Sequence, residues 1–238
     1  PGLRGKSVRE NPERVDPEYV QIPKDFYVLH KFVTLAADVM FVNGISFFMT
    51  FSRDIRMITA EFIPSRAAAM LSSALTKIVK LYARGGFVVR LVLMDREFEC
   101  IKDDFDKVVV NTSAAREHVG EIERQIRVVK ERCRCCNSEL REAGYQYYHR
   151  MVIIHLIYFV CMMINGVIHE NGISQQYSPR EIVLGRAIDF VRDCKATFGA
   201  YIEASRDDTV TNTTRDRTHP CIALGPSGNL QGSTKCFD

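Results

Sequence analysis

The sequence predicts an α/β fold in which helices flank a mixed five-stranded sheet, followed by a truncated small β domain. Three observations lead to this prediction. Residues 32–62 hold three apolar runs separated by short turn signals, which is typical of antiparallel strands. Residues 65–94 hold a helical pattern that leads into a nearly continuous apolar run, typical of a buried parallel strand. From residue 198 onward, Thr, Gly, Pro and Asp become frequent among short β-like pieces.

Composition narrows the class of protein. The chain has 238 residues, of which 46% are hydrophobic, so it can bury a sizeable core and is not wholly disordered. The net charge is only +3, so any basic surface for nucleic acid must be local. The eight cysteines lack the paired spacing of a zinc module, which favours free thiols in a reducing compartment. The chain begins without an initiator Met, and we expect it to be a fragment of a longer polypeptide.

The first strands of the sheet should form a meander. Phe32–Met40, Ile45–Phe51 and Ile55–Phe62 are the three apolar runs. Asn43-Gly44 joins the first two, and this dipeptide is the strongest short signal for a hairpin. Asp38 interrupts the first strand in its middle.

The crossover should follow directly. A helix is predicted to begin at Ser65, which follows Pro64, and to end at Gly85-Gly86. Phe87–Met94 should be a strand buried on both faces, and it ends at Asp95. A crossover of this kind places the new strand beside the first one, next to Asp38. A further short strand is expected at Lys107–Asn111.

The second half should be mainly helical before the small β domain. An amphipathic helix is expected over Ser113–Cys136, and another should begin at Ser178. Met151–Ile164 is apolar almost throughout, but its 14 residues fall short of the ~20 that a membrane span needs. We therefore expect a buried core helix and no membrane contact. We place the divisions at 1–30 for a linker or arm, 31–192 for the main domain and 193–238 for a partial β domain.

One carboxylate on the amphipathic helix stands out. Val119, Ile122, Ile126, Val129 and Cys133 recur at helical spacing and define the buried face. At about 100° per residue, Glu123 lies on the shoulder between core and solvent, whereas Glu117 and Glu121 should face solvent. A basic stripe shares this shoulder, formed by Arg116, Arg127, Lys130 and Arg134. The simpler interpretation is a solvated helix with ordinary ion pairs such as Glu123 with Arg127.

Three acids can serve one chemistry. Asp38, Asp95 and Glu123 should approach the same edge of the sheet, where open α/β sheets place their sites. Their oxygen ligands suit hard cations such as Mg²⁺, and two such ions can promote phosphoryl transfer. Each acid also has a structural alternative. Asp38 could accept backbone hydrogen bonds, Asp95 could cap the following turn, and Glu123 could be a surface ion-pair partner.

The order of strands and helices is that of the ribonuclease-H-like fold, and several motifs resemble one family within it. The motifs LAADVMFVNG, LVLMDREFE and the helix segment beginning at Glu123-Arg124 are similar to those around the two aspartates and the glutamate of copia-type retrotransposon integrases, in the retroviral integrase superfamily. SPREIVLGRAIDFVRDCKATFGAYIEA and LGPSGNLQGSTKCF resemble the family's segments after the catalytic core. The resemblance covers about residues 30–238.

The resemblance implies a function and a set of roles. Asp38, Asp95 and Glu123 would be the catalytic residues and would hold Mg²⁺ or Mn²⁺, as two ions. The enzyme would process the 3′ ends of retrotransposon DNA and join them to target DNA. It would be nuclear and a homo-oligomer. The residues expected to contact DNA are Arg116, Arg124, Arg127, Lys130 and Arg134.

Two departures keep other functions open. Only 27 residues lie between Asp95 and Glu123, fewer than is usual in the family, and His118-Val119-Gly120 replaces the usual Asn-Gly before the glutamate. One alternative is an inactive DNA-binding remnant of a decayed retrotransposon. Another is a ribonuclease-H-type nuclease acting on RNA–DNA hybrids, although the basic helix and the β tail argue against it.

Overall fold

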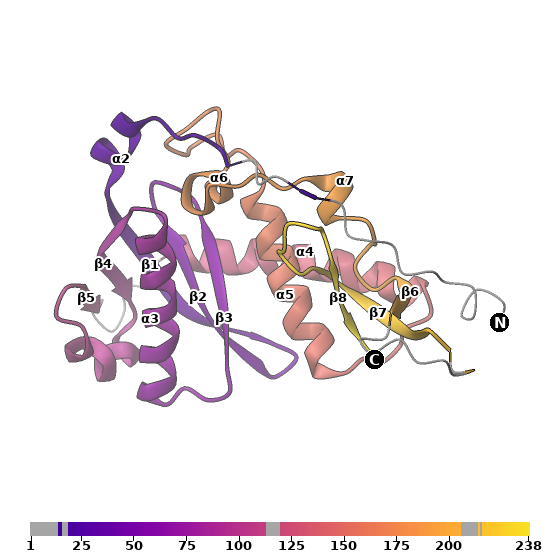
Figure 1. Cartoon of the computed structure of the whole chain (residues 1–238). Coiled ribbons are helices and arrows are strands. Elements are labelled where there is room, and N and C mark those ends of the chain that lie inside the picture. Colours follow the sequence, from indigo (N-terminus) through magenta and orange to yellow (C-terminus); the bar gives the residue numbers. More distant parts are fainter. Residues whose placement is uncertain (1–13, 16–18, 113–119, 206–213, 215) are drawn as a thin grey trace.

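The computed structural model describes residues 14–15, 19–112, 120–205, 214 and 216–238 (Figure 1). A mixed five-stranded sheet forms its centre, in the order β3-β2-β1-β4-β5. The first three strands pair antiparallel, and β4 and β5 continue the sheet in parallel with β1. The strands are β1 Phe32–Val42, β2 Ile45–Ser52, β3 Ile58–Ile63, β4 Val88–Met94 and β5 Val109–Thr112.

The predicted hairpin joins β1 to β2. Asn43 and Gly44 both have positive φ, 49° and 76°, which is the backbone that a tight two-residue hairpin turn requires. Val42 faces Ile45 across this turn, and the register continues without interruption to Leu35 opposite Ser52. This long pairing carries β1 well past the end of β4, so one edge of the outer half of β1 is not covered by a strand of the main sheet.

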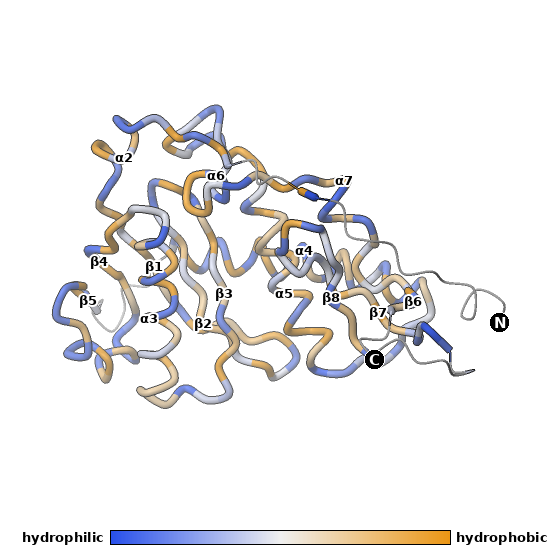
Figure 2. Tube along the Cα trace, viewed as in Figure 1, coloured by the Kyte–Doolittle hydropathy of each residue, from blue (hydrophilic) through white to orange (hydrophobic). Residues whose placement is uncertain are grey.

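Helices cover both faces of the sheet and bury two separate apolar cores. Helix α3 Ala68–Arg84, the 3-10 helix η1 Arg96–Asp104 and α6 Pro179–Leu184 pack on one face. The other face is covered by α4 Gly120–Glu142 and α5 Arg150–Asn165. The apolar segments of Figure 2 follow these inner surfaces. Asn165 fixes the end of α5 to the sheet, because its side chain exchanges two hydrogen bonds with the backbone of Ile58.

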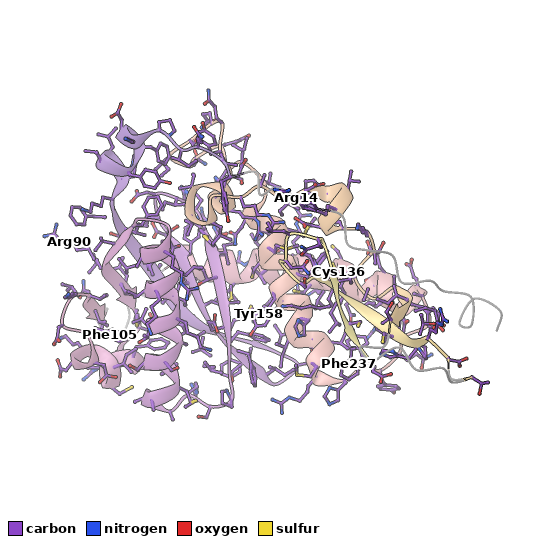
Figure 3. The ribbon with its side chains drawn as sticks, viewed as in Figure 1. Arg14, Arg90, Phe105, Cys136, Tyr158 and Phe237 are labelled. Atoms are coloured by element: carbon purple, nitrogen blue, oxygen red, sulfur yellow. The ribbon has the colours of Figure 1, made fainter. Side chains whose placement is uncertain are left out.

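The small β sheet docks on the outer side of α5. It has the order β6-β7-β8, with β6 Tyr201–Ser205, β7 Thr218–Pro226 and β8 Thr234–Phe237, and follows α7 Phe190–Asp193. The rings of Phe159 and Phe198 lie 5.3 Å apart between α5 and this region. Tyr158, on the same helix, accepts a hydrogen bond from the backbone N–H of Phe62 in β3, so α5 bridges the two sheets (Figure 3).

The structure confirms the predicted fold class, a ribonuclease-H-like mixed five-stranded sheet flanked by helices and followed by a small β sheet. The helix that was expected at Ser178 is also present, where Ser178 and Glu181 form a complete capping box. None of the described helices is both long and apolar enough to cross a membrane.

Several local expectations were wrong in detail. A short helix, α2 Lys24–His30, forms at the end of the predicted arm, and Tyr27 places its ring 5.4 Å from that of Phe87. Strand β4 is not buried on both faces, because Val88 is 40% exposed and Arg90 projects outward (Figure 3). Helix α3 begins at Ala68 without a side-chain cap.

Candidate functional site

Strand β1 aims Asp38 at the face covered by α4 and α5. Val39, like Ala37, belongs to the core under α3, whereas Ala36 and Met40 belong to the core under α4 and α5. Because side chains alternate along a strand, Asp38 lies on the second face between Ala36 and Met40. Its carboxylate is half-buried and accepts a hydrogen bond of 2.6 Å from the N–H of Val39.

The register of β1 and β4 brings Asp95 opposite Asp38. Ala36 of β1 pairs with Leu93 of β4. Because the two strands are parallel, Asp38 faces Asp95 two residues further along each of them. Asp95 follows β4 with an extended backbone, and Met94 packs under α3, so the Asp95 side chain points to the α4 side. Neighbouring strands lie about 4.8 Å apart, which makes these two aspartates close neighbours at the carboxyl end of the parallel pair.

Helix α4 supplies Glu123 in its first turn. Ile122, Val129, Cys133 and Leu140 are buried along this helix, with Ile126 packed beside them, as the predicted apolar face requires. Glu123 is exposed next to Ile122 and therefore lies at the edge of the packed face. Residues 113–119, including Val119 and Arg116 of the basic stripe, lie outside the described residues.

Electrostatics connects the three acids, which we call the carboxylate site. Burial, together with the smaller effects of the negative charges of Asp95, Glu97 and Glu123, raises the pKa of Asp38 to about 6, from an ordinary value of 3.8. The hydrogen bond from Val39 opposes this shift only in part. These three charges come from the end of β4, from η1 and from α4, so the fold gathers acids from three separate segments around Asp38 of β1.

The carboxylate site is not closed around an ion. The oxygens of Asp38, Asp95 and Glu123 do not all lie within 4.8 Å of one another, a distance met in the described residues only by a group in the small sheet. Of the purely structural roles considered for these acids, one is present and another is not. Asp38 does accept a backbone hydrogen bond, whereas Asp95 stands at the N-cap of η1 and makes no side-chain capping hydrogen bond. The catalytic roles therefore stay predictions.

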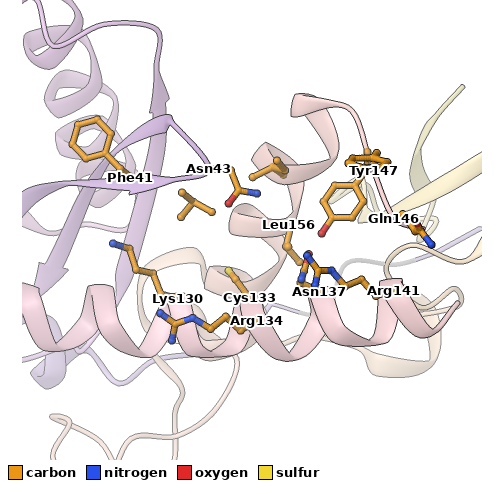
Figure 4. Close-up of a pocket in the computed structure, with 13 residues that line it drawn as sticks. Phe41, Asn43, Lys130, Cys133, Arg134, Asn137, Arg141, Gln146, Tyr147 and Leu156 are labelled. Carbon is orange, nitrogen blue, oxygen red and sulfur yellow. The ribbon is translucent and has the colours of Figure 1, made fainter. Parts of the chain in front are cut away.

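A basic groove begins beside this site and runs along α4. A pocket of about 570 Å³ lies between α4 and the β1–β2 turn, and Lys130, Arg134 and Arg141 project into it (Figure 4). Asn43 faces them from the turn, and Tyr147, whose side chain is 92% exposed, lies on the far rim. Arg124 and Arg127 are exposed on the same helix nearer Glu123. The groove itself thus offers three cations, Lys130, Arg134 and Arg141, and the aromatic ring of Tyr147.

Sequence reasoning missed three residues near the site. Arg141 continues the spacing of Arg127 and Arg134, seven residues or about two turns apart, and was missed because the helix was expected to end at Cys136. Glu97 lies in a 3-10 helix with no clear pattern and pairs with Arg66 at 3.2 Å. Glu121, which was expected to face solvent, makes a 2.7 Å ion pair with Arg53 and ties α4 to the β2–β3 turn.

Comparisons with known proteins found similar solved structures but no similar family model or curated sequence. No protein-family model matches the chain, and no curated protein sequence matches it significantly. The chain is similar to the catalytic core domain of BIV integrase, at 14% identity and a TM-score of 0.45, over 63% of this chain and 93% of that one. It is also similar to the HTLV-2 integrase catalytic core domain in complex with magnesium, described as a trimeric form, at 12% identity and a TM-score of 0.44, over 63% of this chain and 95% of that one.

Proposed function

We propose that this chain is a metal-dependent polynucleotidyl transferase, the integrase of a copia-type retrotransposon, with Asp38, Asp95 and Glu123 as its catalytic carboxylates. The observation that carries the proposal is the gathering of acidic charge around Asp38. Its pKa is raised to about 6 by burial and by Asp95, Glu97 and Glu123. A fold tolerates such crowding of like charges at a functional site when a cation relieves it.

The donor set fits divalent ions of the magnesium class. All three side chains offer carboxylate oxygens, the ligands that Mg²⁺ and Mn²⁺ prefer. Asp38 and Asp95 are half-buried on adjacent strands, and exposed Glu123 can adjust its rotamer toward them. When bound, a pair of such ions supplies Lewis-acid activation of the attacking and leaving oxygens of phosphoryl transfer. The residues of this chain hold the ions and position the DNA strand beside them.

The basic groove would position the DNA end relative to the carboxylate site. Lys130 lies seven residues beyond Glu123, which is about 10 Å along the helix axis, and Arg141 lies about 27 Å from Glu123. Cations spaced in this way contact successive phosphates and fix the register of a DNA end without reading its bases. Tyr147 at the rim is placed to stack on an unpaired base. This groove would receive the retrotransposon DNA end.

The experiment measures DNA joining by the purified chain with Mg²⁺ or Mn²⁺, using a labelled duplex and a supercoiled plasmid target. Asp95→Asn and Glu123→Gln should each lower joining about 100-fold or more, since metal-ion catalysis contributes several kcal/mol to such reactions. Asp104→Asn and Glu139→Gln are matched controls, because both residues are exposed on the same two segments. Joining by either site variant at the rate of the unaltered protein would reject the assignment.

A second candidate function has its own support. The carboxylates of Asp38, Asp95 and Glu123 do not all lie within 4.8 Å of one another. The segment of 27 residues between Asp95 and Glu123 is also shorter than in the integrases that the sequence resembles. Both facts favour a chain that binds DNA without catalysis. Salt-sensitive DNA binding that neither Mg²⁺ nor Mn²⁺ converts into nicking would support this candidate, whereas cleavage of an RNA–DNA hybrid alone would support a ribonuclease-H-type nuclease.

The cellular setting belongs to the same proposal. An integrase that joins retrotransposon DNA to chromosomal DNA acts in the nucleus, and its two DNA ends call for more than one catalytic subunit. We therefore expect a nuclear homo-oligomer whose main domain is residues 31–192, with the arm 1–30 and the β domain 193–238 as accessory parts. Fractionation and the mass of the DNA complex in solution test these two expectations.

A further inference from the structure

Three potential metal ligands meet on one face of the small sheet. Ile222 pairs with Phe237 across β7 and β8, so the next position places Cys221 opposite Asp238. His219 lies two residues before Cys221 and therefore shares its face. One ligand atom from each of His219, Cys221 and Asp238 lies within 4.8 Å of the other two. Strand pairing alone brings together residues that are up to nineteen positions apart in the sequence.

A second thiol lies beside this group. Cys236 is on the same face of β8, two residues before Asp238, and lies close enough to Cys221 to raise the pKa of the Cys221 thiol, although it is not one of the three residues whose ligand atoms all lie within 4.8 Å. Cys221 is buried, at 4% exposure, whereas Cys236 and Asp238 are exposed at the end of the sheet. The four side chains make a set of one nitrogen, two sulfurs and one carboxylate that is open to solvent on one side.

His219 gives independent support for a ligand. Its Nδ1 atom is buried and has no hydrogen-bond partner among the described residues. An unsatisfied buried polar atom costs roughly 1–3 kcal/mol, and such atoms are uncommon in folded proteins. A cation bound through Nδ1 would remove this cost, since neither the thiols nor the carboxylate of the group hydrogen-bonds to Nδ1 in the described structure.

The donors select the kind of ion. Imidazole nitrogen and thiolate sulfur suit Zn²⁺, which takes four such ligands in tetrahedral structural sites at about 2.0–2.3 Å. Mg²⁺ prefers oxygen and has little affinity for sulfur. A site with four protein ligands has no open position for substrate and is therefore structural. Its place between β7 and β8 would fasten the last strand of the small sheet.

We propose that His219, Cys221, Cys236 and Asp238 bind one Zn²⁺ ion that clasps β8 onto β7. Binding replaces the proton of each thiol by a zinc–sulfur bond, and both protons leave to solvent, so no oxidant or reductant takes part. The site is separate from the carboxylate site and does not depend on the function proposed for it.

Zinc titration of the purified full chain tests the proposal. The protein is stripped with a chelator, kept reduced with a phosphine, and titrated with Zn²⁺ alone against a chromogenic chelator. One equivalent should bind tightly, and Cys221→Ser or His219→Ala should weaken it at least tenfold. Cys135→Ser, at an exposed thiol on α4, should leave it unchanged. Asp238→Asn, at the exposed end of the sheet, serves as a further variant in case the buried ones fail to fold.

Two further readings make the test decisive. Hydrogen exchange of Thr234–Phe237 should slow when Zn²⁺ binds, and Co²⁺ in place of Zn²⁺ should give the absorption of a thiolate–cobalt bond that disappears in Cys221→Ser. The proposal is overturned if the reduced protein binds no Zn²⁺, if Asp238→Asn and Cys135→Ser bind it equally well, or if Cys221 and Cys236 form a disulfide even with Zn²⁺ present.

Discussion

The carboxylate site and the histidine–cysteine cluster of the small sheet, His219, Cys221, Cys236 and Asp238, gather their side chains in opposite ways. Three atoms of the cluster lie within 4.8 Å of one another, whereas those of Asp38, Asp95 and Glu123 do not. Charge explains the difference. Imidazole and thiol groups are neutral, and burial raises the pKa of the Cys221 thiol to about 11, so the single carboxylate side chain of the cluster, that of Asp238, has no second carboxylate in the cluster to repel it. Carboxylates repel one another, and the charges of Asp95, Glu97 and Glu123 add to the effect of burial in raising the pKa of Asp38.

The spacing of candidate ligands without an ion therefore depends on their charge. A set of donors with one carboxylate can be brought together by strand pairing alone, and the ion then binds their lone pairs. Acidic donors stay apart until a cation compensates their repulsion, which increases steeply at short distance in a low dielectric. Open spacing at the carboxylate site is therefore compatible with metal binding, and changes that act on one region should spare the other.

The largest expected effect concerns the support of the carboxylate site. Ile122, on the buried face of α4 directly before Glu123, is 1% exposed. Ile122→Ala should lower the free energy of unfolding by about 2–5 kcal/mol, because it leaves a cavity between α4 and the sheet. Denaturant unfolding measures this loss. Met70→Ala, at a partly exposed position of α3, should cost much less, and equal losses would show that α4 is not held by this contact.

A smaller loss of stability is expected where the small sheet, which carries the cluster, packs on α5. Gly225 has φ +96°, and a Cβ atom there would lie 3.0 Å from the ring of Phe159 on α5. Gly225→Ala should cost about 1–3 kcal/mol through backbone strain, and more through the ring contact. Gly228→Ala is the matched control, because Gly228 also has positive φ but nothing lies near its added Cβ. Thermal unfolding of both variants isolates the docking of the small sheet on α5, and equal destabilisation would contradict this docking.

The third effect depends on pH. Since the pKa of Asp38 is raised to about 6 in the folded chain, folding favours its protonated form, and stability falls as pH rises from about 4 through 6. Asp38→Asn removes this penalty while keeping an oxygen for the Val39 N–H. The variant should be more stable than the unaltered protein by about 1 kcal/mol at pH 7–8, after allowing for solvent screening of a half-buried group.

Unfolding midpoints at several pH values test the charge effect. The advantage of Asp38→Asn should vanish below about pH 4, where the carboxyl is protonated in both states. In the unaltered protein, Mg²⁺ should raise the melting temperature at neutral pH, and this gain should shrink in the variant. An advantage that is the same at pH 4 and pH 8 would show that the half-buried negative charge of Asp38 is not its source.

The smallest effect tests the groove that leads away from the carboxylate site. Arg141→Ala removes one cation, so the slope of the logarithm of DNA affinity against the logarithm of salt concentration should fall by about 1. Arg132→Ala is the control, because Arg132 is exposed about 180° around the same helix. Fluorescence anisotropy with a labelled duplex distinguishes them, and identical slopes would place the DNA elsewhere.

The sequence predicted the main sheet because its signals are local. Asn43-Gly44 specified the hairpin, and the apolar run before Asp95 specified β4 beside β1. The placement of Asp38 and Asp95 on neighbouring strands follows from that topology. Helix α2 was missed because its seven residues bury no side chain of their own and depend on contacts such as that of Tyr27 with Phe87.

The histidine–cysteine cluster could not be predicted in the same way. His219-x-Cys221 and Cys236-x-Asp238 are short alternating pairs with no zinc-module spacing, and only the register of β7 with β8 unites them. Glu97 was missed because its position depends on the turn of η1 rather than on a periodic pattern. Both cases need tertiary pairing that no short stretch of sequence encodes.

The most direct test of the central claim is Mn²⁺ binding to the carboxylate site, followed by electron paramagnetic resonance of the free ion. The cluster is first filled with Zn²⁺, so that Mn²⁺ reports on the acids alone. We predict that Asp38→Asn, Asp95→Asn and Glu123→Gln each weaken Mn²⁺ binding about tenfold or more, whereas Glu139→Gln leaves it unchanged. Binding by Glu123→Gln that equals that of the unaltered protein would contradict the claim that these three carboxylates form one site.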